Sequence, residues 1–506
     1  MPLIRTAMTL SGPVRGLPAA DPRVTSYKGI PFAAPPVGEN RWRAPLPCAH
    51  WKEELQAFDY APIGPQAVTG KNKENIYTRE WHVEDEPLMD EDCLYLNVWA
   101  PAEGRDGLPV FVWFFGGGLQ VGSTTEMEFD GERIARRGIV VVTVNYRLNA
   151  FGFLAHPELS DESPEAPANF GFLDQQMALH WVRDNIAAFG GDPGRVTIGG
   201  QSAGGMSVSA QIAHKENRGL FQNAAILSGI FLQAYPGRFG LVASLKEAEE
   251  RGSRFFAEAL GVKTLKAARA LPWQTILEAS LKWKAGGMWP ACVDGAFLRY
   301  SPDRWYQEAE RVVCPVLMGS TMDEFLMSPP AENEVELKKL AKEMPGLDAD
   351  SFLRQFSRPL TAQSIKKEGA VSTIDLAVRA AAKAAGSPVY AYRFGADIPG
   401  WDTPGAFHSV DLWFFFETLA KCWRPFVGRH YDLARQMCDY LSNFVHAGDP
   451  NGQGTNGSPL PYWPALDTDH PVMMSFQDSA QALQSPLSPV SRLLLASYMA
   501  RGGGET

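Results

Sequence analysis

The sequence predicts an α/β protein built on a large, mostly parallel central sheet with helices on both faces. In the first 230 residues, short β-rich runs alternate with glycine-rich turns and helical stretches. Alternation of this kind implies parallel strands that are joined by helical crossovers. The expected strands are Tyr95–Trp99, Val110–Phe115, Ile139–Val144 and Arg195–Gly199, and a long amphipathic helix at 174–189 lies between the last two.

After residue 230 the pattern changes to charged helical segments that two further strands interrupt. These elements are expected at 244–281, Val313–Met318, 334–360, 375–385, Val389–Phe394 and Tyr431–His446. We interpret the helical segments as capping insertions, around 235–290 and 330–385, within a single domain that spans residues 1–506.

Composition narrows the class of protein. The 506 residues are 45% apolar and 21% charged, which is ordinary for a globular chain with a large core. The net charge of −10 argues against nucleic-acid binding, because no basic stripe is present to neutralise phosphates. The apolar runs are of strand length, so we expect no membrane span. Six scattered cysteines lack metal-ligand spacing and indicate a reducing compartment. We expect a cytoplasmic protein, or a secreted one if a leader has been removed.

Gly200-Gln201-Ser202-Ala203-Gly204 is the most informative motif of the chain. It joins the strand expected at 195–199 to a helix-capable run at 203–214. A serine in a tight strand-to-helix turn is a nucleophile elbow, which exposes its hydroxyl above the sheet edge. We expect side chains at positions 200 and 204 to collide with neighbouring strands. The pattern alone arises by chance in a chain with 47 glycines, so the serine also needs partners.

A serine nucleophile needs a histidine base and an acid that orients it, in the chain order serine, acid, histidine. Five of the nine histidines follow Ser202. His214 would lie about three turns up the elbow helix, and His430 and His446 flank the C-terminal helix. His408 lies in a loop after the strand at 389–394, where catalytic groups of parallel sheets collect. We therefore favour His408 as the base, and the alternative is an incidental loop histidine.

Two adjacent carboxylates are candidates for the acid. Asp323 and Glu324 follow the strand expected at 313–318, on a loop between Ser202 and His408 in the chain. Their chemistry does not separate them, although Asp323 suits the alternative role of a helix N-cap better.

A second glycine-rich loop, Gly116-Gly117-Gly118, directly follows the strand at 110–115. Consecutive glycines allow backbone amides to turn inward and meet a developing oxyanion. A flexible turn is the alternative, but the position of the loop upstream of a strand, a helix and the elbow favours an oxyanion loop.

Taken together, these motifs resemble the type-B carboxylesterases, which include the cholinesterases and the bacterial para-nitrobenzyl esterases. The resemblance covers nearly the whole chain and implies an α/β-hydrolase fold. Its motifs are Gly29-Ile30-Pro31-Phe32-Ala33, Glu91-Asp92-Cys93-Leu94, Asn145-Tyr146-Arg147, Phe151-Gly152-Phe153-Leu154 and the segment 169–205.

The resemblance implies a role for several residues. The acid is then Glu324, and the oxyanion donors are the backbone amides of Gly117, Gly118 and Ala203. Trp289 falls where the family builds its acyl pocket. No metal and no organic cofactor is required.

The chain also departs from the family pattern. Gln201 stands where many relatives carry glutamate, which removes a negative charge beside the site and argues against a choline-binding enzyme. Gly64 falls where the disulfide partner of Cys93 is expected, so Cys93 is predicted to be a free thiol, as in an intracellular bacterial-type enzyme. Trp81 lies near the position of a choline-binding tryptophan, and a packing aromatic is the alternative.

The expected activity is the hydrolysis of small-molecule carboxylic esters through an acyl-serine intermediate, by a monomer or homodimer. The alternatives are a non-catalytic binding or adhesion protein of the same fold, and an amide or lactone hydrolase. Aromatic residues in 60–90, 230–290 and 320–335 favour bulky or aryl esters. They are Trp81, Phe231, Tyr235, Phe239, Trp283, Trp289 and Phe325.

Overall fold

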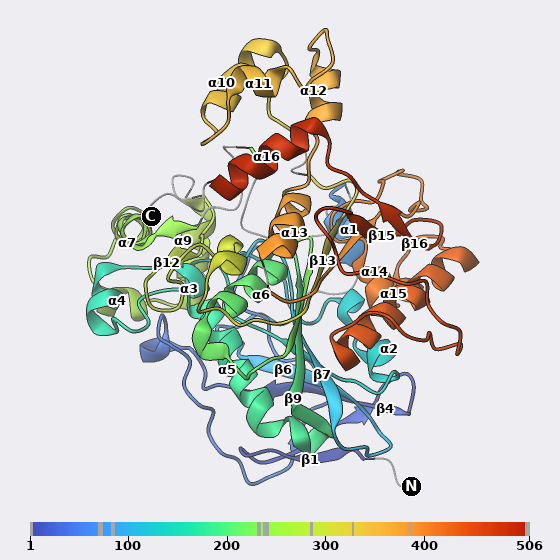
Figure 1. Cartoon of the computed structure of the whole chain (residues 1–506). Coiled ribbons are helices and arrows are strands. Elements are labelled where there is room, and N and C mark those ends of the chain that lie inside the picture. Colours follow the sequence, from blue (N-terminus) through green and yellow to red (C-terminus); the bar gives the residue numbers. More distant parts are fainter. Residues whose placement is uncertain are drawn as a thin grey trace.

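An eleven-stranded sheet runs through the centre of the computed structural model (Figure 1). The structure describes residues 4–68, 74–81, 87–229, 234–235, 242–283, 287–325, 328–384 and 386–500. The strands, in their order across the sheet, are β16 (Ala480–Gln484), β15 (Val472–Phe476), β14 (Val389–Phe394), β13 (Val316–Thr321), β10 (Asn223–Leu227), β9 (Gly191–Gln201), β7 (Leu108–Phe114), β8 (Val140–Val144), β6 (Tyr95–Pro101), β4 (Val24–Pro31) and β3 (Leu17–Pro18).

The central strands of the sheet, from β15 to β8, are parallel to one another, and the flanking strands are antiparallel. The expectation of a mostly parallel central sheet is therefore confirmed. Two small sheets accompany it. They consist of β1 (Thr6–Met8), β2 (Pro13–Arg15) and β5 (Leu55–Gln56), and of β11 (Ala243–Ser244) and β12 (Cys292–Val293).

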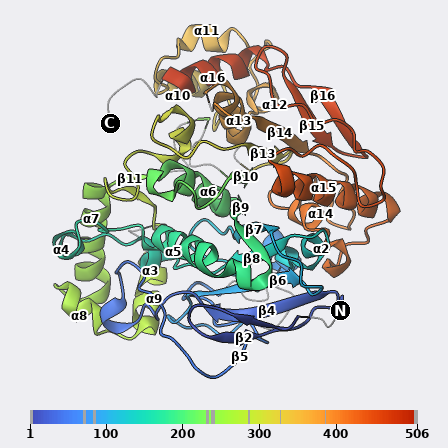
Figure 2. The same cartoon turned by 60° about the horizontal axis from the view of Figure 1, so that its bottom comes forward.

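Helices cover both faces of the sheet (Figure 2). One face carries α5 (Phe170–Asn185), α6 (Ala203–Ala213) and α13 (Thr373–Ala384), and the other carries α2 (Glu132–Ala135), α14 (Leu412–Phe415) and α15 (Gly428–Ala447). The smaller helices before α5 are α1 (Ile76–Trp81), α3 (Asn149–Phe153) and α4 (Pro157–Glu162). No described helix is long and apolar enough to cross a membrane.

The alternation of side chains along β7 explains the two cores. Val110 and Val112 join the cluster that packs under α5 and α6, whereas Phe111 and Trp113 join the cluster under α14 and α15. Successive side chains of a strand point to opposite faces, so a strand that is covered on both faces is apolar throughout.

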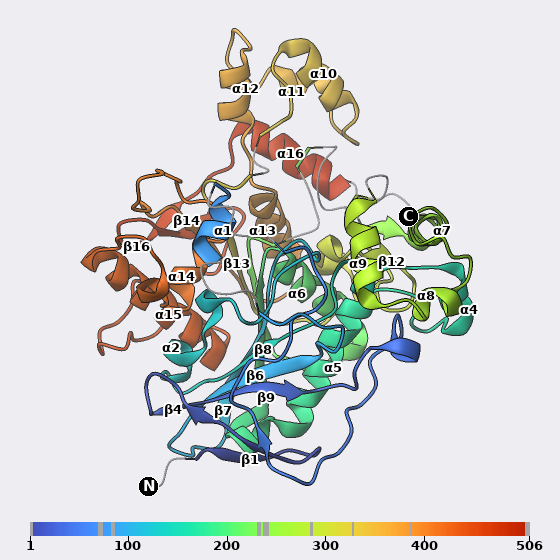
Figure 3. The same cartoon turned by 180° about the vertical axis from the view of Figure 1, so that it is seen from behind.

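Two groups of helices after residue 240 lie apart from each other in the fold (Figure 1). The first contains α7 (Leu245–Arg254), the π-helix Phe255–Leu260, α8 (Leu265–Arg269) and α9 (Trp273–Lys282). The second contains α10 (Glu334–Lys342), α11 (Ala349–Leu353) and α12 (Ala362–Gly369), which project beyond α16 (Pro489–Ala500) in Figures 1 and 3.

Two expected elements differ from the observed ones. The strand expected at Val313–Met318 is observed at Val316–Thr321. Pro315 directly precedes it, and the strand begins after this residue because a proline has no N–H for a sheet hydrogen bond. The helix expected at 334–360 is split into α10 and α11, since Pro345 and the left-handed Gly346 end it.

The register of the parallel strands places the functional loops at one edge. Phe114 at the end of β7 pairs with Gly200 of β9, and Gln201 pairs with Leu227 of β10. Thr321 at the end of β13 pairs with Phe394 at the end of β14. The loops that follow these ends therefore gather at the carboxyl edge of the sheet, where open α/β sheets bind their ligands.

Candidate active site

Ser202 occupies the turn between β9 and α6 in a strained conformation. Its φ of 56° and ψ of −124° lie in a region that non-glycine residues rarely adopt. The backbone N–H of Ser202 donates to the carbonyl of Leu227 at 2.9 Å, which ties the turn to the neighbouring strand. A strained serine between a strand and a helix is the geometry that a nucleophile elbow requires.

The glycines of the elbow allow backbone to pack against backbone. A Cβ atom at Gly204 would lie 2.0 Å from the carbonyl oxygen of Phe114 on the adjacent strand β7, as expected. A Cβ at Gly200 would instead lie 2.3 Å from the backbone of Gly204, so the collision expected with a neighbouring strand is with the elbow helix itself. A side chain at either position would push the helix away from the sheet.

The glycine loop after β7 lies directly against the serine. A Cβ atom at Gly116 would come within 3.1 Å of the Cβ of Ser202. Gly117 and Gly118 have φ values of 106° and 66°, which glycine adopts without strain. Ala203 is the first residue of α6, where a backbone N–H has no acceptor within the helix. The structure thus places Gly116, at the start of the glycine loop, and Ala203, at the start of α6, beside Ser202.

Two glutamines, which the sequence analysis did not single out, hold this loop. Gln66 accepts a hydrogen bond from the N–H of Gly122 at 2.8 Å and donates to the carbonyl of Gly122 at 3.0 Å. Gln120 donates to the carbonyl of Trp289 at 2.8 Å and accepts from the N–H of Trp289 at 3.1 Å. These hydrogen bonds fix the C-terminal side of the loop, at residues 120 and 122, to segments that are remote in the sequence.

His408 and Glu324 form a close, buried pair. The Nδ1 of His408 lies 2.6 Å from Oε2 of Glu324, and Thr321 Oγ1 donates to Oε1 of the same carboxylate at 3.0 Å. Burial raises the pKa of Glu324, but the charge of His408 and the hydrogen bonds to the carboxylate outweigh it, so the net pKa is lowered. Glu324 is therefore ionised and able to orient the ring of His408.

The pKa of His408 is set by two opposed effects. Burial acts to lower it, while the charge of Glu324 and the hydrogen bond to it act in the other direction and prevail, so the pKa is raised above its ordinary 6.5. The raised pKa favours the protonated form of His408, the form that the carboxylate of Glu324 stabilises.

Asp323 has a structural role that differs from that of Glu324. Its carboxylate accepts a hydrogen bond from the N–H of Ala406 at 2.7 Å, and its own N–H donates to the carbonyl of Ala406 at 3.1 Å. Asp323 thus fastens the loop that carries His408 to the end of β13. It is not a helix N-cap, and Glu324 alone of the two contacts the histidine.

Gln201 contacts the histidine directly. Its Nε2 lies 3.2 Å from Nε2 of His408. Because the Nδ1–H of neutral His408 is donated to Glu324, the other ring nitrogen accepts from the Gln201 amide. Among the described residues, Gln201 rather than Ser202 Oγ is the hydrogen-bond partner of that nitrogen.

A second buried carboxylate lies near this pair and was missed in the sequence. Asp411 follows His408 by three residues, is fully buried, and accepts a hydrogen bond from the hydroxyl of Tyr392 at 2.7 Å. Burial, with a contribution from the charge of Glu324, raises the pKa of Asp411 to about 6. An apolar loop sequence around Asp411 was the available signal, since a lone aspartate within a buried run needs a polar partner.

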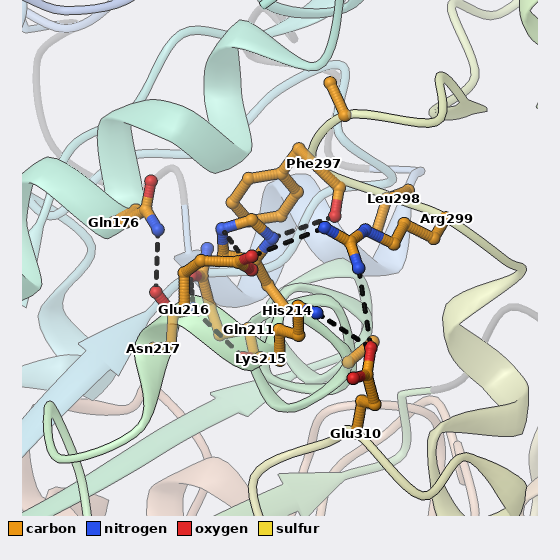
Figure 4. Close-up of polar contacts among 12 residues, drawn as sticks. Gln176, Gln211, His214, Lys215, Glu216, Asn217, Phe297, Leu298, Arg299 and Glu310 are labelled. Carbon is orange, nitrogen blue, oxygen red and sulfur yellow. Dashed lines mark hydrogen bonds and ion pairs between the residues drawn. The ribbon is translucent and has the colours of Figure 1, made fainter. Parts of the chain in front are cut away.

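Three other histidines that follow Ser202 in the chain are held elsewhere. His214 caps the end of α6, where it stacks on Phe297 and hydrogen-bonds its carbonyl at 3.0 Å (Figure 4). His430 and His446 contact the backbone carbonyls of Asp397 and Arg137. The preference for His408 as the histidine beside the acid is thus supported by the positions of its competitors.

Comparison with known proteins agrees with this geometry. The model of the carboxylesterase family matches residues 2–370 and 337–490. The chain belongs to the carboxylesterase family. It is 31% identical to the para-nitrobenzyl esterase of Bacillus subtilis over 476 residues, which cover 90% of this chain and 91% of that protein. It is 32% identical to the fumonisin B1 esterase of Sphingopyxis macrogoltabida over 493 residues, or 92% and 85% of the two chains.

Solved structures of carboxylesterases share the fold. A PNB esterase structure superposes with a TM-score of 0.77 at 28% identity and covers 97% of this chain and 99% of its own. A Geobacillus stearothermophilus carboxylesterase gives a TM-score of 0.76 at 29% identity, with 97% and 100% covered. This carboxylesterase therefore has the α/β-hydrolase fold, and serine ester hydrolysis is the general function of its family.

The carboxylesterase keeps Cys93 as a buried free thiol, as predicted. A Cβ atom at Gly64 would lie 3.3 Å from the Sγ of Cys93, so Gly64 occupies the position expected for a disulfide partner. Burial raises the pKa of the Cys93 thiol well above its ordinary value, so the thiol stays protonated.

The aromatic residues expected to line the pocket are distributed over several parts of the enzyme. Trp289 is buried in edge-to-face contact with Phe255 and close to Trp283. Phe325 packs edge-on against the ring of His408. Phe231 and Phe239 lie outside the described residues. Tyr235 is buried and donates to the carbonyl of Gly369, so it packs in the core.

Trp81 is at the end of α1, stacked on Tyr77 and close to Phe407, the residue before His408. Helix α1 is anchored by the ion pair of Arg79 with Asp402 and by the buried ion pair of Glu80 with Arg424. The packing alternative for Trp81 accounts for its aromatic contacts.

Proposed function

We propose that this enzyme hydrolyses carboxylic esters with Ser202 as nucleophile, His408 as general base and acid, and Glu324 as the orienting carboxylate. The observation that carries the proposal is the 2.6 Å contact of His408 with Glu324, in a loop beside the strained Ser202. The amides of Gly117, Gly118 and Ala203 are the proposed oxyanion donors, as their places around Ser202 support.

In the first half-reaction, Nε2 of His408 takes the proton of Ser202 Oγ while the oxygen attacks the carbonyl carbon of the ester. Gln201 has to yield this nitrogen, because a neutral imidazole has one acceptor position. The carbonyl bond opens to an oxyanion, which backbone N–H groups stabilise. The intermediate collapses, the carbon–oxygen bond to the alcohol breaks, and the alcohol takes the proton from His408.

The second half-reaction releases the acid. A water molecule gives a proton to Nε2 of His408 and attacks the acyl carbon, which restores an oxyanion in the same place. Collapse of this intermediate breaks the bond to Ser202, whose oxygen recovers the proton from His408. Glu324 remains ionised throughout and stabilises the imidazolium, as its lowered pKa supports.

We propose bulky or aryl esters as the substrates. Aromatic rings near the site support this class, since Phe325 lies against His408 and Trp289 is tied to the glycine loop through Gln120. Trp81 is proposed as a more distant wall, behind Phe407. A steady rise of activity with acyl chains longer than roughly eight carbons would contradict a pocket of this size.

The decisive experiment replaces the nucleophile. Ser202→Ala is expected to abolish turnover of para-nitrophenyl acetate and labelling by a fluorophosphonate probe while the circular dichroism spectrum is retained. Ser209→Ala is the matched control, because Ser209 lies on the same helix and, among the described residues, its hydroxyl hydrogen-bonds only the carbonyl of Gly205. Undiminished turnover by the Ser202 variant would refute the assignment.

We also propose how the chain is organised. Helices α7–α9 and α10–α13 are proposed as insertions into a single catalytic domain, which would work as a monomer or homodimer. All six cysteines are free thiols, which supports a reducing, cytoplasmic compartment.

A further inference from the structure

A cavity of about 430 Å³ lies beside the end of β13, apart from the oxyanion loop and the elbow. Its walls come from the end of β13, from α12 and α13, from β14 and from the segment 485–491 that leads into α16. The volume falls within the range of natural small-molecule sites. Ser202, His408 and Glu324 are not among the residues that line it.

Two arginines of this cavity share one carboxylate. Arg393 Nη2 lies 2.9 Å from Oδ1 of Asp375, and Arg379 Nε lies 3.5 Å from the same oxygen. The longer distance exceeds that of a good hydrogen bond. The Nε of Arg379 is buried and has no hydrogen-bond partner in the described part of the chain, while its Nη2 donates to the carbonyl of Ser485. A buried guanidinium is thus held in place with an unused donor.

The cavity is cationic within an anionic protein. Its lining contains three cationic side chains, Lys367, Arg379 and Arg393, against the two carboxylates of Glu368 and Asp375. The whole chain carries a net charge of −10. Rigid arginine forks bind carboxylates in a bidentate way, so a local excess of guanidinium groups favours a carboxylate ligand.

The rest of the lining argues for an organic ligand rather than an inorganic one. Val371 and Val490 are buried and Leu487 is half-buried, which gives the cavity an apolar wall. Asp375 would repel a doubly charged phosphate more strongly than a singly charged carboxylate. A small apolar molecule with one carboxylate matches both the cationic and the apolar parts of the lining.

We propose that this cavity is a second binding site of the enzyme, specific for a small organic monocarboxylate whose carboxylate lies against Arg379 and Arg393. If the proposed function holds, the carboxylic acids that the enzyme releases belong to this class of ligand. Binding at the second site requires no turnover. The site is joined to the catalytic machinery by Thr321, which lines the cavity and also donates a hydrogen bond to Glu324.

Benzoate is a suitable probe, and its neutral analogue benzamide tests the need for charge. Isothermal titration calorimetry of the whole enzyme is expected to show benzoate binding that Arg393→Gln weakens at least about tenfold, the effect of losing one charge-assisted contact. Arg393 is 36% exposed, so its replacement is compatible with folding. Ala370→Trp, at an exposed position of the lining, is expected to fill the cavity and abolish binding without a change of charge.

Lys366→Ala is the matched control, because Lys366 precedes Lys367 on α12 and does not line the cavity. Its affinity for benzoate should equal that of the unaltered enzyme. The proposal is overturned if the unaltered enzyme binds no benzoate, if benzamide binds equally well, or if Arg393→Gln and Ala370→Trp leave the affinity unchanged. The last result would place benzoate in front of Ser202 instead. Loss of esterase activity in Ser202→Ala has no bearing on these outcomes.

Discussion

Replacing Gln201 by glutamate should move the pH dependence of the enzyme upward. In the structure, the Gln201 side-chain nitrogen lies 3.2 Å from Nε2 of His408. Gln201→Glu keeps the length of the side chain but replaces a neutral donor with a carboxylate. The carboxylate stabilises the imidazolium form of His408, so the pKa of the histidine rises and less of it is neutral at a given pH.

The size of the shift follows from this distance. Opposite unit charges 3.2 Å apart attract by roughly 5 kcal/mol at an effective dielectric constant of about 20. The desolvation of the new carboxylate and its repulsion from Glu324 consume part of this energy. Opposite charges at such distances raise the pKa of a base by about 1–3 units, and we expect a shift within that range.

The assay is the pH profile of kcat/KM with para-nitrophenyl acetate, whose acid limb reports the pKa of the free base. In Gln201→Glu the limb should move to higher pH by at least about one unit, with activity recovered in alkaline buffer. Gln201→Met removes the hydrogen bond without adding charge and should shift the limb by less than about one unit. An unmoved limb, or a shift to lower pH, in the glutamate variant would refute the reasoning.

Three further changes test the packing of the molecule. Gly204→Ala forces a Cβ to within 2.0 Å of the Phe114 carbonyl and should cost several kcal/mol, seen as a large drop in Tm with loss of activity. Arg424→Met leaves the buried carboxylate of Glu80 unpaired and should cost about 3–5 kcal/mol by urea unfolding. The pKa of Asp411 is raised to about 6, so the unaltered enzyme should lose up to about 3 kcal/mol of stability as the pH rises from 4 to 6. Asp411→Asn removes this titrating carboxyl. Tm measurements across pH should therefore show no such loss in the variant.

Each of these changes has an outcome that would contradict it. Gly428→Ala is the control for Gly204, because a Cβ at Gly428 meets no atom within 4 Å and its backbone is not left-handed. Arg429→Met breaks only an exposed ion pair and should cost less than about 1 kcal/mol. Equal losses in a variant and its control would show that the close contact or the burial is not the cause. For Asp411, the raised pKa means that the protonated carboxyl stabilises the fold at low pH, and this stability is lost as the pH rises. If Tm depends on pH in the same way in Asp411→Asn and in the unaltered enzyme, burial of this carboxyl is not the cause.

Much of the fold could be predicted because its signals are local. The strands at 110–115 and 389–394 are apolar runs that end in loops, and the elbow at Ser202 carries its glycines within five residues. Placing His408 and an acid at the ends of later strands needed only the rule that catalytic groups collect there. The structure places His408 against Glu324, as that rule implies.

The remaining contacts could not be predicted because they depend on segments far apart in the chain. Gln66 reaches Gly122, and Gln120 reaches Trp289, through hydrogen bonds that leave no periodic pattern in the sequence. The contact of Gln201 with the histidine depends on the path of the loop before His408, which Asp323 fixes from another strand. The sequence singled out Gln201 only because a neutral amide stands where many relatives carry glutamate. Its contact with His408 became visible only in the structure.

The glycine contacts around Ser202 have a consequence for how such enzymes diversify. The turn, the oxyanion loop and the neighbouring strand meet through main-chain atoms, as at Gly204 and Phe114, so the alignment of the reacting groups depends little on side-chain identity nearby. The aromatic side chains proposed as pocket walls belong to helices and loops outside this backbone frame. Substrate preference can therefore change without disturbing the alignment of the reacting groups. A library that varies these aromatic side chains and keeps the glycines should contain a high proportion of active members.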